Sequence, residues 1–358
     1  MTFTLSEEQT LLKDAARDFC REQAPVTRLR KMRDDKKNGR DPELWAEMAA
    51  MGWAGILVPE EFGGAGLGYV GLGLVLEQAG RTLVASPLHS TALVGASALL
   101  LGGSDAQKQA WLPKIAAGEV TVALAVDESA HHAPARSKLK VVGGKISGAK
   151  KYVADGHTAD LLLVVGADGL YLVKADGPGV TRRELITVDS RGAADIEFDN
   201  APAEKLEGGP KLVQQVLDRA AIGLAAEMLG QAQEAFEITN EYLKTRKQFG
   251  QYIGSFQALQ HRAAKMFTDI ELTRSCILAA LDALDRNADD MSEYASLAKA
   301  RASDMLHVVS NEFVQMHGGI GMTDAHDAGL YMKRARVVEA LYGGATYHRD
   351  RYAKLLGF

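Results

Sequence analysis

Apolar residues recur at the three- to four-residue spacing of an amphipathic α-helix in the first third of the chain. One such pattern begins near Ser6, and another covers 42–52 with Asp41 as the predicted N-cap. Further helices are predicted at 70–82, 90–101 and 105–112. We therefore expect a helical domain over 1–119.

The hydrophobic pattern changes period after residue 119. Short β-prone runs separated by Gly and Asp lie at 120–126, 138–142, 145–147, 161–165, 169–173, 179–183 and 196–198. No helical pattern fits between these runs. The sequence predicts a small antiparallel β domain over 120–205.

Longer helical patterns return near Gly209. They cover 211–247, 257–288, 292–316, 325–338 and 346–356. Breaks fall at 290–292 and at 318–321. The order of helices, strands and helices predicts a mainly α protein with a central β domain, in three units at 1–119, 120–205 and 206–358.

Composition narrows the class of protein. The chain has 358 residues, which exceeds one compact core, and 47% are apolar and 24% charged. The net charge is -5 without a basic block, so we expect no nucleic-acid partner, and no apolar run predicts a membrane span. The two cysteines, Cys20 and Cys276, exclude a disulfide framework and favour a reducing cytoplasm.

The break between the first two long C-terminal helices has an unusual composition. Segment 245–254 contains Arg246, Phe249 and two glycines, which suit a tight turn or a close backbone approach to a ligand. A guanidinium beside glycines can bind phosphate with two parallel hydrogen bonds. The alternative is a basic helix C-terminus that stabilises the helix dipole.

Three segments resemble motifs of the acyl-CoA dehydrogenase family of flavoproteins. Arg246–Gly250 with Ile253–Gln257 is similar to the signature at this corner, Val58–Gly68 to the N-terminal loop, and Gln315–Met322 to the C-terminal glycine motif. The matches occur in family order across nearly the whole chain. The resemblance implies an N-terminal helical domain, a middle β-barrel and a C-terminal four-helix bundle.

The resemblance also implies the reaction, which is α,β-dehydrogenation of an acyl-CoA substrate. A carboxylate removes the α proton while the β hydrogen leaves as hydride to the flavin of FAD. Family residues that bind the pyrophosphate and adenosine end of a neighbouring subunit's FAD match Arg246, Phe249, Gln315, Gly318 and Gly319, with Gln257 as a further candidate. The alternative role of these residues is helix termination at two bundle corners.

The middle domain matches the family less completely. Segment 146–156 resembles the family's Asn-Gly-x-Lys-x-Trp-Ile-Thr-Asn-Gly, so Tyr152 would replace the tryptophan beside the flavin, whereas Ala154 has no hydroxyl. Segment 126–129 stands in place of Val-Thr-Glu-Pro but lacks the following Gly-Ser-Asp. The flavin-ring pocket is therefore expected to be incomplete. The adjacent His131-His132 has no further ligand at metal spacing and predicts a solvated loop.

The family's catalytic base is missing at both of its known positions. One lies within Tyr-Glu-Gly-Thr, where this chain has Gly343, and the other precedes an arginine and corresponds to Ala220, followed by Ala221. Asp218 is the remaining candidate base. It lies two residues early, about 200° around the helix, which predicts a surface carboxylate.

Three hypotheses follow. The chain resembles the degenerate subunit of heteromeric bacterial acyl-CoA dehydrogenases, such as those that act on steroid side-chain CoA thioesters. It would then form a heterotetramer with another acyl-CoA dehydrogenase-like subunit that carries the base. The second hypothesis is a self-sufficient homotetramer that uses Asp218, and the third is a scaffold without cofactor. The C-terminal segment 347–351 is predicted to form a short interface helix.

Overall fold

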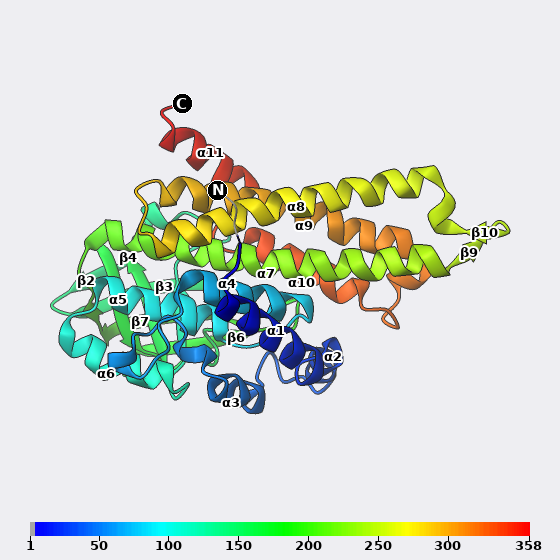
Figure 1. The fold of residues 1–358 in the computed structure, drawn as a ribbon. Coiled ribbons are helices and arrows are strands. Elements are labelled where there is room, and N and C mark those ends of the chain that lie inside the picture. Colours follow the sequence, from blue (N-terminus) through cyan, green and yellow to red (C-terminus); the bar gives the residue numbers. More distant parts are fainter. Residues whose placement is uncertain (1–3) are drawn as a thin grey trace. The chain divides into compact units, whose positions relative to one another are not determined.

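The computed structural model, drawn as a ribbon in Figure 1, describes residues 4–358. Its residues divide into two compact units. The helical unit contains residues 4–27 together with 73–84 and 221–358. The mixed unit contains 28–72 and 85–220. Helices α4 (Gly68–Arg81) and α7 (Gly209–Thr245) contribute residues to both. As predicted, the protein is mainly helical with a central β region.

The helical unit begins with α1 (Glu7–Glu22), which starts where the sequence predicted. Ser6 and Gln9 form a capping box: the Gln9 backbone N–H donates to Ser6 Oγ at 3.1 Å, and the Ser6 N–H donates to Gln9 Oε1 at 3.0 Å. These two bonds satisfy N–H groups that a helix N-terminus leaves without partners. The start of α1 is thus set by local sequence.

Five helices from the C-terminal part of the chain also belong to this unit. They are α7, α8 (Gln257–Asp285), α9 (Met291–His317), α10 (Ala328–Ala340) and α11 (Ala345–Leu355). Helix α9 packs against α8, α10 and α11. A buried ion pair joins α7 to α10, because Arg334 Nε and Nη2 donate to the two Glu227 carboxylate oxygens at 2.9 and 3.1 Å.

The mixed unit contains shorter helices. They are α2 (Val26–Asp34), α3 (Pro42–Ala50), α5 (Ala96–Gly102) and α6 (Asp105–Ala116). The predicted N-cap of α3 is confirmed, since Asp41 Oδ1 accepts from the Leu44 N–H at 3.1 Å. The predicted helix at 90–101 differs in part, because Leu88–Gly95 is a π-helix that continues into α5.

Two four-stranded sheets complete the mixed unit. One has the order β1-β4-β5-β8, with strands Val122–Ala125, Leu161–Gly166, Gly169–Lys174 and Glu204–Lys205. The other has the order β2-β3-β7-β6, with strands Lys140–Val142, Lys145–Ala154, Ala193–Pro202 and Val180–Leu185. The pair β1–β4 is parallel, which the sequence did not predict. Strands β3 and β7 are also longer than the predicted runs.

Within the described part of the chain, no helix combines the length and apolar character needed to cross a bilayer. Cys20 and Cys276 are free thiols, as expected from the sequence. The division into domains at 1–119, 120–205 and 206–358 stays a prediction.

Candidate functional site

A short β-hairpin with a two-residue turn follows the end of α7, where the sequence predicted only a corner between helices. Strands β9 (Lys247–Gln248) and β10 (Gln251–Tyr252) pair antiparallel, and Phe249 and Gly250 form the turn with φ of 53° and 80°. Positive φ at both central residues is the condition for a type I′ turn. The Phe249 side chain is 91% exposed, and Figure 1 shows the hairpin beyond the ends of α7 and α8.

The C-terminal glycine motif lies at the end of α9. Gln315 is exposed in the last turn of this helix, and Gly318 follows it with φ of 62°. A Cβ added at Gly318 or Gly319 would meet no atom within 4 Å, so the backbone here faces open space. A ligand could therefore approach these peptide groups closely.

One aromatic contact brings the two motifs to the same end of the helical unit. Tyr242, in the last turns of α7, stacks on His317 with ring centroids 4.3 Å apart. Arg246 follows Tyr242 by one helical turn and is exposed. Gln257, the first residue of α8, is exposed as well. The structure thus groups the predicted FAD-binding residues of this unit.

This grouping can hold an anion beside an aromatic ring. Arg246 provides donors in the planar arrangement that matches a phosphate, Gly318 and Gly319 offer accessible backbone, and Phe249 offers an exposed ring face. The pyrophosphate and adenine of FAD fit this set of groups.

Tyr152, the predicted aromatic wall for the flavin, belongs to the mixed unit. It lies at an irregularity in the β3–β7 pairing, with φ of 53° and a 59% exposed side chain. Its N–H donates to Asp195 Oδ1 at 3.1 Å, and Lys151 Nζ lies 3.1 Å from Asp195 Oδ2. Asp195 therefore fixes the backbone that presents the Tyr152 ring to solvent.

The loop after β1 is held by an ion pair between a buried lysine and a partly buried glutamate, which the sequence did not reveal. Lys150 is completely buried and donates to Val126 O at 2.8 Å and to Glu128 Oε1 at 3.1 Å. Glu128 also accepts from Ser137 Oγ at 2.6 Å and from the Lys138 N–H at 3.0 Å. Although burial opposes it, these bonds lower the pKa of Glu128 to about 2. Burial in turn lowers the pKa of Lys150, and Glu128 opposes that effect.

The prediction of a solvated loop at His131-His132 is wrong for one of the two residues. His131 is exposed, but the His132 side chain is only 8% exposed and its Nδ1 lies 3.0 Å from Asp127 Oδ2. Asp127 also accepts from the Ala133 N–H at 3.0 Å, so a short turn buries His132. The described residues contain no group of three or more side chains arranged to hold a metal ion.

Asp218 is not the surface carboxylate that its helix position predicted. It is 1% exposed, and Gln214 Nε2 donates to its Oδ1 at 3.1 Å. The reason is that α7 is a regular helix whose residues from 216 to 232 are all buried, so it has no solvent face there. The adjacent Arg219 is also buried, and its Nε donates to Tyr69 Oη at 2.8 Å.

Neither family base position carries a carboxylate. Ala220 and Ala221 are both buried, and the Ala220 carbonyl accepts from His89 Nε2 at 2.9 Å. Gly343 lies in the turn between α10 and α11 with φ of 98°. The structure thus leaves Asp218 as the one predicted candidate that has a titratable side chain.

The N-terminal and C-terminal parts of the chain match models of the same protein family. A model of the acyl-CoA dehydrogenase N-terminal domain matches residues 6–119, and a model of the C-terminal domain matches residues 207–357. The protein named acyl-CoA dehydrogenase IpdE2 from Mycolicibacterium smegmatis is 31% identical over 343 residues, which are 95% of this chain and 96% of that protein. The similarity therefore extends over nearly the full length of both chains.

Two solved structures are also similar to this chain. A variant of the Tcur3481-Tcur3483 steroid ACAD has a TM-score of 0.91 and 33% identity, covering 99% of this chain and 98% of that one. The ChsE4-ChsE5 complex from Mycobacterium tuberculosis has a TM-score of 0.89 and 26% identity, covering 99% of each chain.

Proposed function

The chain belongs to the acyl-CoA dehydrogenase family, FAD-dependent oxidoreductases that act on acyl-CoA, and we propose that it is the subunit of a heteromeric enzyme that supplies no base. In this proposal Arg246, Phe249, Gln315, Gly318 and Gly319 bind the pyrophosphate and adenosine of FAD held mainly by a partner chain. The partner is another acyl-CoA dehydrogenase-like subunit, in a heterotetramer.

The exposure of the hairpin carries this proposal. An apolar ring that is 91% exposed gains nothing for the isolated chain, and burial of such a ring on assembly is favourable. The backbone at Gly318 and Gly319 is open as well, because a Cβ added at either residue would have no atom of this chain within 4 Å. A second molecule or ligand could cover this backbone on assembly. Groups arranged in this way suit a ligand shared with a second molecule.

The loss of the base supports a division of labour between the two chains. Gly343, Ala220 and Ala221 have no group that could remove an α proton, so the base would come from the partner. FAD, when bound, accepts the hydride. This chain's contribution is to bind and orient the cofactor through Arg246 and the glycine backbone.

The named relatives suggest the substrate. One of the similar solved structures is called a steroid ACAD, and both bear names of two proteins. We propose a bulky, steroid-derived acyl-CoA as the substrate class, with the enzyme in the cytoplasm. The residues Tyr152 and Gln257 remain candidate contacts to FAD, at the flavin and at the adenosine end.

Flavin stoichiometry tests the proposal most directly. The chain purified alone and the chain co-expressed with a candidate acyl-CoA dehydrogenase-like partner subunit are compared by flavin absorbance and native mass. We expect little flavin on the chain alone and about one FAD per pair of chains in the mixed complex. One FAD per chain in an active homotetramer would refute the heteromeric assignment.

The role of Arg246 is tested in the mixed complex. Loss of a charged hydrogen bond to phosphate removes about 1.5–3 kcal/mol, so Arg246→Ala should weaken FAD binding by about 10- to 150-fold. Lys244→Ala is the matched control, because Lys244 is also an exposed cation at the end of α7. Equal FAD affinity of the two variants would remove Arg246 from the binding site.

The burial of Asp218 gives the self-sufficient homotetramer a specific observation in its favour. The Asp218 carboxylate is 1% exposed and so is shielded from bulk water, as a group that takes a proton from a bound substrate would be. In that case Asp218→Asn in the chain purified alone should lower the rate by at least about 100-fold with FAD still bound. An unchanged rate would dispose of Asp218 as a base.

A further inference from the structure

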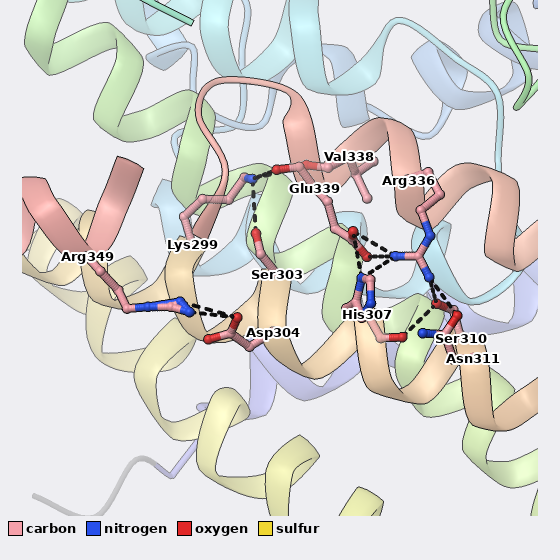
Figure 2. Close-up of polar contacts among 10 residues, drawn as sticks. All are labelled: Lys299, Ser303, Asp304, His307, Ser310, Asn311, Arg336, Val338, Glu339 and Arg349. Atoms are coloured by element: carbon pink, nitrogen blue, oxygen red, sulfur yellow. Dashed lines mark hydrogen bonds and ion pairs between the residues drawn. The ribbon is translucent and has the colours of Figure 1, made fainter. Parts of the chain in front are cut away.

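The turn between α10 and α11 is held by two buried basic side chains. Lys299, on α9, is 0% exposed and donates to the carbonyl oxygens of Val338 and Gly343, both at 3.0 Å. Two weaker acceptors are Glu339 O at 3.2 Å and Ser303 Oγ at 3.3 Å. Figure 2 shows the Lys299 side chain extending from α9 to the end of α10.

The second side chain comes from α11. His348 is 2% exposed, and its Nε2 donates to Tyr342 O at 3.0 Å. Lys299 and His348 thus bind adjacent carbonyl groups of one turn from two different helices. Carbonyls at a helix C-terminus lack intrahelical partners, so Lys299 also satisfies Val338 and Glu339 at the end of α10.

The turn that these bonds hold has a strained backbone. Tyr342 has φ of 57° and Gly343 has φ of 98°, so two consecutive residues are left-handed. An L-residue with a side chain enters this region at an energetic cost, and only glycine enters it freely. The hydrogen bonds from Lys299 and His348 keep the turn in this conformation.

Position 343 also has no room for a side chain. A Cβ added there would lie 2.4 Å from Tyr347 Cδ1, 3.0 Å from Tyr347 Cε1 and 3.1 Å from His348 Nε2. By contrast, a Cβ at Gly344 would meet only Glu339 O at 3.6 Å, and Gly344 has φ of -80°. The two neighbouring glycines therefore differ sharply in what they can accommodate.

We propose that Lys299 is a positioning residue that holds the Tyr342–Gly344 turn in a form closed to a catalytic carboxylate at 343, where the Tyr347 ring occupies the space. This inference rests on the proposed function and deepens it. The chain is then without a base because its backbone excludes one, and a simple Gly343→Glu substitution does not supply it.

Double-mutant cycles on the purified chain test the positioning role. Gly343→Ala should lower the midpoint of thermal unfolding by about 5 °C, and Gly344→Ala, the matched control, by less than about 2 °C. Tyr347→Ala should remove at least about half of the Gly343→Ala shift, because the clashing ring is gone. Lys299→Met should do the same, because the turn is free to relax.

Additive shifts in both cycles would overturn the proposal, since a lysine that merely stabilises the bundle would leave the effect of Gly343→Ala unchanged. If the alanine variant at 343 is too unstable to purify, the Tyr347→Ala background is the test, and recovery of folded protein there supports the closed turn. Equal tolerance of alanine at 343 and 344 would refute it.

A functional arm adds excess FAD and an acyl-CoA to the Gly343→Glu chain and uses only preparations whose absorbance shows bound flavin, so that missing cofactor does not explain a missing rate. We expect no dehydrogenation by this chain alone. A rate that appears with Gly343→Glu and is lost with Gly343→Gln would show that the position is open, and would overturn the inference. The flavin stoichiometry of the wild-type pair decides the proposed function separately, so the two ideas can fail independently.

Discussion

Replacing Lys299 by methionine should change how stability depends on pH. Complete burial lowers the pKa of Lys299 from the usual 10.5 to about 7, and the Glu339 carboxylate opposes this effect. In the unfolded chain the pKa returns to its usual value. This difference in the Lys299 pKa between the folded and the unfolded chain corresponds to about 5 kcal/mol in the free energy of unfolding.

The sign follows from proton binding. Between pH 7 and 10.5 the unfolded chain binds a proton at Lys299 that the folded chain has lost, so the free energy of unfolding rises with pH. The rise is up to about 1.4 kcal/mol per pH unit, or about 3 kcal/mol between pH 7 and 9.5. Below pH 7 the contribution is constant. Lys299→Met lacks it, so the wild type should gain stability over the variant as pH rises.

Urea unfolding at pH 6, 7, 8, 9 and 9.5 measures this difference. The effects of other titratable groups near Lys299 largely cancel, because the wild type and the variant both contain them. These groups are Glu339 and Arg336 on α10, His307 on α9 and His348 on α11. Lys265→Met, at an exposed position of α8, is the control and should follow the wild type. If the free energy of unfolding changed with pH in the same way for the wild type and Lys299→Met, the pKa of Lys299 would not be lowered in the folded chain.

Two further predictions concern buried charges. Glu227→Ala leaves Arg334 buried without its bidentate partner and should lower the free energy of unfolding by about 3–5 kcal/mol, whereas the exposed Glu241→Ala should change it little; urea unfolding at pH 7 measures both. Glu128, with its pKa lowered from 4.5 to about 2, contributes stability that is present above pH 4.5 and is lost as pH falls toward 2. Glu128→Gln should therefore be less stable at pH 7 by up to about 3 kcal/mol and show a shallower acid dependence in circular dichroism, and an unchanged acid profile would contradict this.

Much of the fold follows from local signals in the sequence. The long helices were predicted close to their ends because their apolar spacing and breaks are local, and the caps at Ser6 and Asp41 form with residues three positions away. The resemblance in three motifs pointed to Arg246, Phe249 and Gly318, which lie exposed at one end of the helical unit. Their assignment to FAD stays a prediction.

The rest depends on contacts that no local pattern encodes. Asp218 was placed on the surface by an argument that assumes one solvent face per helix, and α7 has none at that point. The parallel pairing of β1 with β4 joins segments more than thirty residues apart. The acceptors of Lys299 are backbone carbonyls some forty residues further along, and carbonyls have no signature in the sequence.

The backbone conformation at Gly343 also affects how a catalytic glutamate could arise at this position by mutation. A GGA or GGG glycine codon becomes a glutamate codon by one base change, so the genetic step to a carboxylate at this position is short. The steric cost of that change is high, because the new Cβ would lie 2.4 Å from Tyr347 Cδ1 and the backbone is left-handed. A glutamate at this position would therefore need a second change that removes the clash with Tyr347. The substitution at 343 alone would destabilise the turn. If the chain works beside a second subunit, as proposed, this turn would help to keep it dependent on the base of that subunit.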